Sequence, residues 1–516
     1  MGRKCVKCKW VFEIKRNGIF RSRLVACGYS QVPGVDFTES YAPVINDITW
    51  RILIIIKMIF GYSAKIVDVE TAFLYGDLDE EIFMDCPPGM EHEEDECLEL
   101  NKSIYGLVQA ARQYYLKFTQ VLRKIGFIGG KADPCLFKRQ DTNGTVFIAI
   151  WVDDSLLIGD DLAIEATIKD LRKAGFNLKI EGSLDDYLSC EISMNDNNTK
   201  GWIHQPHLLK KLELKFGKDV EKLQDYTTPG TPGISTLRDA DLAVSKEEHK
   251  YYRSGVGMLL YLVKHTRPDI ANAVRELSKA LDKPSPAAIK EMKRVIKYVL
   301  TTKNQALKVA PTPMTQDEMW TMTAFSDSDY ATDPETRRSI TGFVLYLMGV
   351  PISWKSKGQK SVSLSSTEAE YIALSETAKE VRFVYQVLES IGFKVKLPIV
   401  IRVDNVGAIF LSENVAISQR TKHVDIRYRF VQEFILDGFL KIVFVKTEEN
   451  DADIMTKNLR KDLFLTHSEK LMGDKSMDFG VDRKGVGRYR SQNESCGTKI
   501  VENGIDGETT GDSEKV

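Results

Sequence analysis

The sequence predicts a multidomain protein of mixed α/β and α+β class. Its 516 residues are enough for about three domains of roughly 150 residues each. Hydrophobic residues make up 43% of the chain and charged residues 28%, a balance typical of a globular protein. Short apolar runs that suit strands alternate with longer stretches of helical periodicity as far as about residue 468.

Hydropathy and charge limit the classes of function. No apolar run reaches the ~20 residues of a membrane span, and the longest candidate, Ile48–Tyr62, is interrupted by Arg51 and Lys57. That segment suits a core helix better, so we expect no membrane partner. The net charge of −2 does not by itself indicate nucleic-acid binding, but residues 3–23 contain many Lys and Arg and a single acid, Glu13. Such a basic stretch either binds phosphate or forms an ordinary solvated surface.

Residues 1–195 are predicted to mix short strands with helices. Asn17-Gly18 is a strong hairpin signal between two apolar runs. The glycine at 126 closes a long stretch with helical periodicity. The expected elements are the strands Trp10–Lys15 and Phe20–Ala26, the helix Thr49–Phe60, the strand Ala64–Val69, the helix Ile104–Gly126 and two strands within Val146–Ile158.

The rest of the chain divides into three parts. Residues 196–315 are predicted to be mostly helical, and residues 316–467 to form one compact α/β layer. Residues 468–516 are rich in Gly, Ser, Asp and Glu and are predicted to be a disordered tail. The elements expected in the α/β layer are the strands Thr323–Phe325, Gly342–Leu347, Pro351–Trp354, Ile399–Val403 and Phe439–Val445, a helix Ser366–Ile391, a helical pair ending near Leu436 and a helix near Asp453.

A first set of acidic residues lies at the ends of apolar strands. Asp153 and Asp154 separate Val146–Val152 from Ser155–Ile158, and Asp68 ends the run Ala64–Asp68. An exposed turn is the alternative explanation, but unpaired carboxylates beside a core are costly and divalent cations remove that cost. Three carboxylates at strand ends can hold two Mg²⁺ ions about 4 Å apart, which is the geometry of in-line nucleotidyl transfer.

These acidic residues belong to an ordered series of motifs that resembles the reverse transcriptase of copia-type LTR retrotransposons. The resemblance covers nearly all of residues 9–465. It implies a right-hand polymerase, with fingers and palm in residues 1–195 and thumb and connection in residues 196–315. The motifs are Trp10–Arg16, Arg23–Ala26, Gly28–Gln31, Ala42–Val44, Asp68–Gly76, Pro87–Gly89, Ile104–Arg112 and Val152–Asp154.

The resemblance also implies four contacts to the incoming dNTP. Phe73 stands five residues after Asp68, where the family has an aromatic steric gate against the ribose 2′-hydroxyl; a core position is the alternative. Arg21 and Arg23 lie on the fingers hairpin and suit bidentate contacts to the triphosphate, although either one can be a plain surface residue. Gln109 matches a family glutamine that would line the dNTP pocket, and it could equally cap a helix.

A second set of acidic residues lies near the C-terminus. Asp327 and Asp404 are at strands, Glu370 is on the long helix and Asp453 opens the last helix. Four acids in this arrangement suit another two-Mg²⁺ site, one that activates water to cut RNA.

Glu368 competes with Glu370 for the metal. Ser365 and Glu368 have the spacing of a capping box, which gives Glu368 a structural role and leaves Glu370 for the metal.

This C-terminal part resembles the ribonuclease H fold, whose helix motif matches Ala369-Glu370. His423 is expected to start a helix or to pack, and Asp329 is expected to be a turn residue. The copia-type motifs present here are Trp354–Lys357, Ser365–Tyr371, Asp404-Asn405, Lys422–Asp425 and Ala452–Lys457.

Together the resemblances imply an RNA- and DNA-directed DNA polymerase with ribonuclease H activity. The implied cofactor is Mg²⁺, with Mn²⁺ as a substitute, and the implied partners are an RNA template, a DNA primer and product, RNA–DNA hybrid and dNTPs. The implied location is a cytoplasmic virus-like particle, with the nucleus as the alternative. A stand-alone nuclease would not explain the segment before residue 195.

The alternative function is a truncated, catalytically inactive relict that at most binds nucleic acid. Two departures from the family pattern favour it: Trp151 replaces the usual Tyr or Phe, and Leu188-Ser189-Cys190 replaces a Leu-Gly pair.

Overall fold

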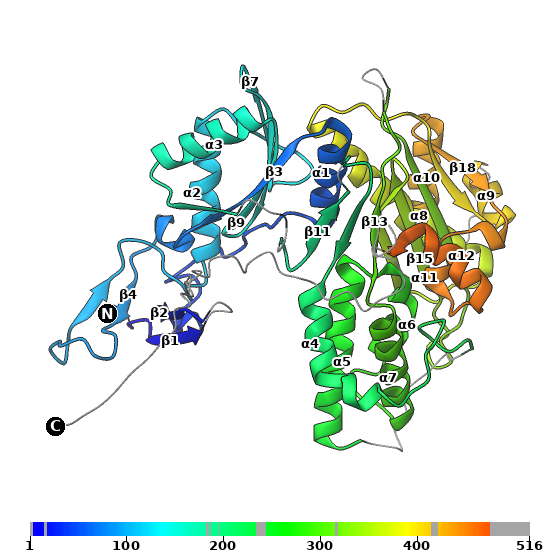
Figure 1. Ribbon diagram of the computed structural model, residues 1–516, viewed down its shortest axis with the longest axis horizontal. Coiled ribbons are helices and arrows are strands. Elements are labelled where there is room, and N and C mark those ends of the chain that lie inside the picture. Colours follow the sequence, from blue (N-terminus) through cyan, green and yellow to red (C-terminus); the bar gives the residue numbers. More distant parts are fainter. Residues whose placement is uncertain are drawn as a thin grey trace, which may run out of the picture. The chain divides into compact units, whose positions relative to one another are not determined.

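The computed structural model confirms the mixed α/β, multidomain fold class (Figure 1). It describes residues 4–14, 18–181, 184, 187–195, 197–233, 244–314, 318–413 and 422–474, with the backbone alone for 422–426 and 428. Three of its sheets, of six, four and five strands, follow one another along most of the described chain. Four short 3₁₀ helices accompany them: η1 (Gly28–Ser30), η2 (Ala72–Tyr75), η3 (Pro268–Ile270) and η4 (Thr447–Glu449).

The six-stranded sheet is antiparallel throughout and has the order β10-β3-β9-β8-β7-β6. Its central strands are almost wholly buried, as their continuous apolar sequence requires. The strands are β3 (Ser63–Val69), β6 (Ile128–Gly129), β7 (Leu136–Asp141), β8 (Gly144–Trp151), β9 (Asp154–Gly159) and β10 (Leu178–Glu181), and the accompanying helices are α1 (Asp47–Phe60), α2 (Ala110–Lys124) and α3 (Asp161–Lys173).

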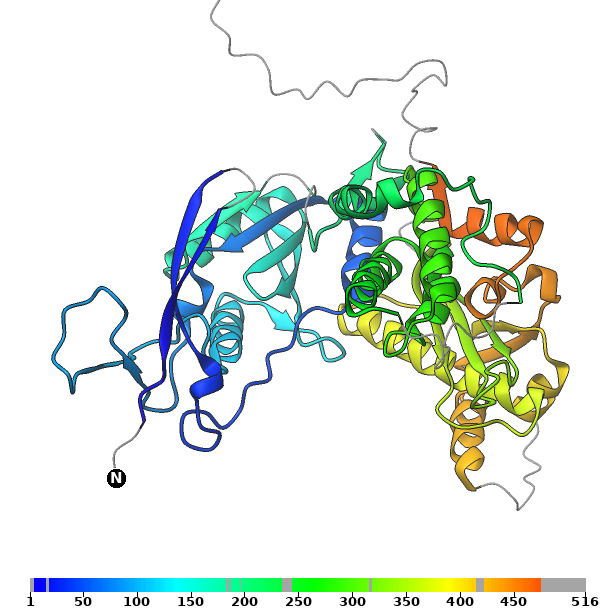
Figure 2. The same cartoon turned by 90° about the horizontal axis from the view of Figure 1, so that it is seen from below.

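The two strands of the predicted N-terminal hairpin are confirmed, while Lys15 and Asn17, at the predicted turn, lie outside the described residues. Strands β1 (Cys8–Ile14) and β2 (Phe20–Ala26) pair in register from Cys8 opposite Ala26 to Ile14 opposite Phe20 (Figure 2). A second small pair, β4 (Phe83–Asp85) and β5 (Cys97–Glu99), is joined to the start of the chain by hydrogen bonds between the backbones of Val6 and residues 83 and 85.

The predicted helix Ile104–Gly126 begins later, at Ala110. The cause is Gly106, which has φ 92° and whose added Cβ would come within 2.0 Å of the Ala26 carbonyl oxygen. The Ala26 amide donates to the Tyr105 carbonyl at 2.8 Å, so residues 104–109 follow the base of the hairpin rather than a helical path. Only glycine fits both the left-handed φ and this close approach.

In the described part of the expected helical region, four helices of 8 to 20 residues lie alongside one another (Figure 1). They are α4 (Pro206–Val220), α5 (Lys246–His265), α6 (Ala271–Ser278) and α7 (Pro286–Thr301). The region also supplies strands to a four-stranded antiparallel sheet of order β11-β12-β13-β19, made of β11 (Glu191–Met194), β12 (Gly201–His204), β13 (Gln305–Val309) and β19 (Met472–Asp474).

The prediction of a disordered tail is wrong for residues 468–474, which have regular structure. Helix α12 (Lys461–Leu471) continues through residue 468, and β19 then pairs with β13. Leu471 and Met472 are buried, which supplies the apolar contacts that hold the segment. Residues 475–516, the remainder of the predicted tail, lie outside the described residues.

The five-stranded sheet has the order β16-β15-β14-β17-β18, with the first three strands antiparallel and the last two parallel to β14. Helix α8 (Ser366–Ser390) packs on β14 and β15. The first strand is longer than predicted and carries Asp327 within it. The strands are β14 (Met322–Asp329), β15 (Ile340–Leu347), β16 (Val350–Gly358), β17 (Ile399–Val403) and β18 (Leu440–Phe444), and the other helices are α9 (Val406–Glu413), α10 (Lys422–Leu436) and α11 (Asp453–Thr456).

Helix α1 is the core helix that the sequence predicted. Residues 52–56 are fully buried, and the Arg51 guanidinium donates to the carbonyls of Ile352 and Lys264 at 2.9 and 2.7 Å. The polar interruption therefore ties α1 to β16 and α5. Among the described residues, no helix combines the length and apolar character that crossing a membrane requires.

Candidate active sites

The first acidic set gathers at one edge of the six-stranded sheet. The antiparallel register places Asp68 of β3 directly opposite Asp154 of β9. Asp153 lies in the two-residue turn between β8 and β9, and its carbonyl accepts from the Val69 amide at 3.0 Å. All three side chains are half-buried. Buried strands on either side thus bring the predicted carboxylates to the same edge.

The turn between β8 and β9 is strained. Val152 has φ 53°, a left-handed conformation that is unfavourable for a β-branched residue. Two-residue hairpin turns need such a conformation to match the twist of the strands. The neighbouring strands hold the strain in place, and strain of this kind concentrates at functional sites.

The negative charge at this edge affects the pKa values of two nearby tyrosines. Burial, together with the charges of Asp153, Asp68 and Asp154, raises the pKa of Tyr114 on α2 well above its usual value. Burial and Asp153 also raise the pKa of Tyr105, while Arg21 and Arg23 oppose the rise. The Tyr105 phenol therefore lies within reach of both the acidic edge and the basic hairpin.

Of the predicted dNTP-contact residues, Arg23 on the hairpin and Phe73 after β3 meet at Tyr105. The Arg23 guanidinium lies over its ring, 5.6 Å from the centroid, and forms an ion pair with Glu13 at 3.1 Å. The Phe73 ring, on η2, packs against Tyr105 with centroids 4.7 Å apart and is half-buried. Phe73 is thus partly accessible beside the acidic edge.

Gln109 does not join this group. It is 1% exposed, its side-chain oxygen accepts from Gln31 at 3.0 Å, and its amide nitrogen donates to the Asp36 carbonyl at 2.7 Å. Both the oxygen and the nitrogen of the Gln109 side-chain amide therefore form hydrogen bonds that hold the loop 31–36 to the start of α2. Gln109 is the N-cap residue of α2, but its side chain makes no capping hydrogen bond, so the alternative that it caps the helix with its side chain is wrong. Its role in the dNTP pocket stays a prediction, and its buried hydrogen bonds favour a structural role instead.

We expect Gln109→Leu to lower stability without changing dNTP binding. The substitution leaves the Gln31 amide and the Asp36 carbonyl without partners, and each buried unsatisfied group costs about 1–3 kcal/mol. The melting temperature should fall, and the KM for dNTP, measured where the variant is folded, should not change. Gln120→Leu, at an exposed position on α2, is the control. A raised KM at unchanged melting temperature would contradict the structural role.

Tyr105 is the residue that sequence reasoning missed at this site. It lies inside the motif Ile104–Arg112, so its position was available, but nothing in the sequence distinguishes a tyrosine that faces a site from one that packs. The close approach of Gly106 to Ala26 turns the chain here and brings Tyr105 beside Phe73.

The two departures from the family pattern are visible in the structure. Trp151 is half-buried, with the Lys264 ammonium 5.7 Å from its ring centroid. Leu188 and Ser189 have φ values of 54° and 61° in the turn closed by Tyr187 and Cys190. Glycine would adopt such values without strain, so the turn forms here at a conformational cost.

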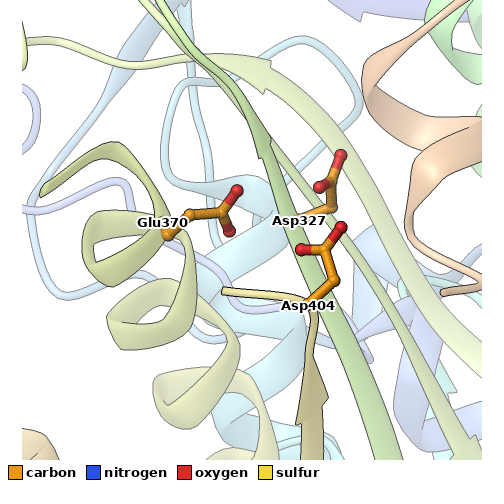
Figure 3. A group of neighbouring side chains, drawn as sticks. All are labelled: Asp327, Glu370 and Asp404. Atoms are coloured by element: carbon orange, nitrogen blue, oxygen red, sulfur yellow. The ribbon is translucent and has the colours of Figure 1, made fainter. Parts of the chain in front are cut away.

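The second acidic set forms a tight cluster (Figure 3). One carboxylate oxygen each from Asp327, Glu370 and Asp404 lie within 4.8 Å of one another. Among the described residues this is the one group of three or more His, Cys, Asp or Glu placed so that it could hold a metal ion. β14 and β17 are parallel neighbours, which places Asp327 and Asp404 side by side, and the first turns of α8 supply Glu370.

The cluster is electrostatically unfavourable without a cation. Burial, Asp327 and Asp404 raise the pKa of Glu370, and burial is the main cause of the raised pKa of Asp327. The Oε2 atom of Glu370 is buried and has no hydrogen-bond partner. An oxygen-lined, acidic, partly unsatisfied site of this kind fits a hard divalent cation such as Mg²⁺.

Asp453 stands slightly apart from the cluster, next to Lys457. The Lys457 ammonium lies 3.4 Å from Asp327 Oδ2 and 3.4 Å from Asp453 Oδ1. Burial alone would lower the pKa of Lys457, but Asp327 and Asp453 outweigh it and raise that pKa. Thr456 also donates its hydroxyl to Asp327. The sequence motif Ala452–Lys457 includes Thr456 and Lys457, but a role was predicted for Asp453 alone.

Three other predictions near this cluster have different outcomes. Ser365 accepts from the Glu368 amide at 3.1 Å and Glu368 reaches back to the Leu364 amide at 2.7 Å, so Glu368 has the structural role that was expected. Asp329, predicted to be a turn residue, ends β14, and burial raises its pKa to about 6. The side chain of His423 lies outside the described residues.

Comparison with known proteins agrees with the motifs. Residues 1–219 match the family described as reverse transcriptase (RNA-dependent DNA polymerase). The chain is 34% identical over 475 residues to the retrovirus-related Pol polyprotein from transposon TNT 1-94 of Nicotiana tabacum, covering 90% of this chain and 35% of that protein. It is 30% identical over 318 residues to a putative transposon Ty5-1 protein of Saccharomyces cerevisiae, covering 61% of this chain and 100% of that protein.

The matches differ in extent. The chain spans about a third of the length of the curated Pol polyproteins that it matches over 90% of its own length. Among solved structures, LC11-RNase H1, isolated from compost, aligns with 26% of this chain and 92% of that chain at 14% identity and a TM-score of 0.22.

Proposed function

Because this chain belongs to the reverse transcriptase family of copia-type retrotransposon Pol polyproteins, we propose that it copies RNA and DNA templates into DNA. The observation that carries the proposal is the opposition of Asp68 and Asp154, with Asp153 in the adjoining turn. We assign fingers and palm to residues 1–195, thumb and connection to 196–315 and a nuclease domain to 316–467. The substrates in this proposal are a primed RNA or DNA template and dNTPs.

Asp68, Asp153 and Asp154 would hold Mg²⁺, with Mn²⁺ as a substitute. The bound ions would lower the pKa of the primer 3′-hydroxyl and stabilise the leaving pyrophosphate. Arg21 and Arg23 supply positive charge for the triphosphate from the hairpin, and the Glu13 ion pair orients Arg23. Tyr105 supports one face of Phe73, which holds the gate ring beside the acidic edge.

We further propose that the second acidic set cleaves the RNA strand of an RNA–DNA hybrid. Asp327, Glu370 and Asp404 would hold a divalent ion, which activates water for attack on the phosphodiester. The close approach of these three carboxylates and the unpaired Glu370 oxygen support the assignment. Asp453 would complete the site from α11.

The direct test of the polymerase is primer extension on poly(rA)/oligo(dT) with Mg²⁺. We expect extension by the wild-type chain and loss of extension on chelation with EDTA. Absence of extension under conditions in which the protein is folded would contradict the proposal. It would favour the alternative, an inactive chain that at most binds nucleic acid, which a filter-binding measurement on the same template would detect.

Phe73→Val should weaken selection against ribonucleotides. A smaller side chain leaves room for the 2′-hydroxyl, and contacts of this size change selectivity by about tenfold or more. The measurement is the ratio of kcat/KM for dTTP to that for UTP on the same primed template. Leu74→Val, at the exposed neighbouring position, is the matched control. An unchanged ratio in Phe73→Val would show that the ring is a packing residue.

A further inference from the structure

Lys457 places a positive charge inside the second acidic set. Its ammonium lies 3.4 Å from a carboxylate oxygen of Asp327 and 3.4 Å from one of Asp453. The Asp327 and Asp453 side chains are 1% and 4% exposed, whereas the Lys457 side chain is 35% exposed. The lysine therefore reaches from the surface into a buried pair of acids.

The acidic set has two parts that share Asp327: the group Asp327, Glu370 and Asp404, and the pair Asp327 and Asp453. The two parts differ in the cation that can neutralise their charge. Asp327, Glu370 and Asp404 come close enough to share one ion, and Asp453 is outside that group. The Lys457 ammonium already lies within 3.4 Å of both Asp327 and Asp453. Asp327 belongs to both parts, and its Oδ2 accepts from Thr456 as well.

We propose that Lys457 occupies the second cation position of this site, so that one divalent ion binds at Asp327, Glu370 and Asp404 and a second binds only after Lys457 has moved away. The proposal rests on the nuclease function proposed above. A lysine suits the role because its ammonium is a single charge on a flexible stem, which can withdraw to solvent, whereas the forked guanidinium of arginine would hold the two acids more rigidly.

The energetic consequence concerns the metal-free protein. Without the ammonium, two nearly buried carboxylates would face each other with no cation, and breaking a buried ion pair in this way is strongly destabilising. The wild-type chain should therefore tolerate removal of divalent ions. A variant without the Lys457 charge should depend on divalent ions for stability and should bind the second ion more tightly than the wild type does.

The test compares Lys457→Met with the wild type in EDTA and in Mg²⁺. Met keeps most of the stem and removes the charge. We expect the melting temperature of Lys457→Met to fall by several degrees in EDTA and to recover in millimolar Mg²⁺. Calorimetric titration with Ca²⁺ should show that the second ion at this site binds more tightly to Lys457→Met than to the wild type, while ions at the polymerase site contribute equally to both proteins.

Lys470→Met is the matched control. Lys470 also pairs with a nearly buried aspartate, Asp451, which His467 and Tyr346 contact as well, and this group lies outside the acidic set. The stability that Lys470→Met loses should not be restored by Mg²⁺. Restoration in Lys470→Met equal to that in Lys457→Met, or an unchanged affinity of Lys457→Met for the second ion, would overturn the proposal.

A second measurement uses the wild-type chain and does not depend on the folding of a variant. Acetic anhydride labels accessible lysine amines, and peptide mass spectrometry quantifies each position. Labelling of Lys457 should rise as Mg²⁺ increases through the range of the second binding event, while labelling of Lys470 stays constant. Constant labelling of Lys457 would overturn the proposal. Neither readout requires hybrid cleavage, so a failed nuclease assay would contradict the nuclease function and leave this inference separately testable.

Discussion

Replacing Asp153 with Asn is expected to abolish primer extension while leaving the protein folded. Asn has the size of Asp, so the turn that places the Asp153 carbonyl against the Val69 amide should survive. What is lost is one negative charge where divalent ions would bind, and removing one such preorganised electrostatic group costs about 10³-fold in rate. Steady-state extension on poly(rA)/oligo(dT) in Mg²⁺ measures the effect.

Two comparisons make the Asp153→Asn result specific. Asp161→Asn, at an exposed position on the first turn of α3, should extend the primer like the wild type. Cleavage of an RNA–DNA hybrid by Asp153→Asn should be unchanged, which would show that the chain is folded. Extension by Asp153→Asn at the wild-type rate would remove Asp153 from the polymerase site.

The second large effect is expected from Asp404→Asn, which should stop hybrid cleavage and spare primer extension. The Thr447 hydroxyl donates to Asp404 Oδ2 at 2.8 Å, and the amide oxygen of Asn can accept the same hydrogen bond. The substitution therefore removes charge and preserves shape. Because Asp404 raises the pKa of Glu370, its loss should also lower that pKa. We expect a loss of about 10³-fold in the rate of RNA release.

Asp437→Asn, an exposed acid beyond α10, is the control for general charge effects on this domain. The readout is release of labelled RNA from a preformed hybrid, with primer extension measured on the same preparation. Wild-type cleavage by Asp404→Asn would refute the assignment of the acidic cluster as a nuclease site, and loss of primer extension as well would indicate that the variant had misfolded.

Much of the fold was predictable because its strands are strongly patterned. The hairpin around Asn17-Gly18, the runs on either side of Asp153 and the strand Ile399–Val403 have unbroken apolar or turn sequences, and each appears in the structure with nearly the predicted bounds. The predicted element bounds are wrong where contacts with distant parts of the chain, rather than the local sequence, set the start or end of a helix. Helix α2 starts late because Gly106 packs on the Ala26 backbone, and α12 extends past residue 468 because β13 offers β19 a partner.

The candidate sites divide in the same way. Apolar flanks make an acid conspicuous, so Asp68, Asp153, Asp154 and the second set could be selected from the sequence. Polar side chains without such flanks could not be assigned a role from the sequence. In the structure the buried Gln109 side chain hydrogen-bonds to Gln31 and Asp36, and the Tyr105 ring packs against Phe73. A single uncharged side chain carries no sequence pattern that tells which backbone it will meet.

The sequence by itself determined the family, the order of elements and the acids at strand ends, because buried strands and ordered motifs are local properties of the chain. Only the tertiary structure decided how those acids are neutralised. It brought Asp327, Glu370 and Asp404 within 4.8 Å of one another and set Lys457 between Asp327 and Asp453. The physical reason is that electrostatic interaction depends on distance and burial, which strand register and helix packing set between residues far apart in the chain.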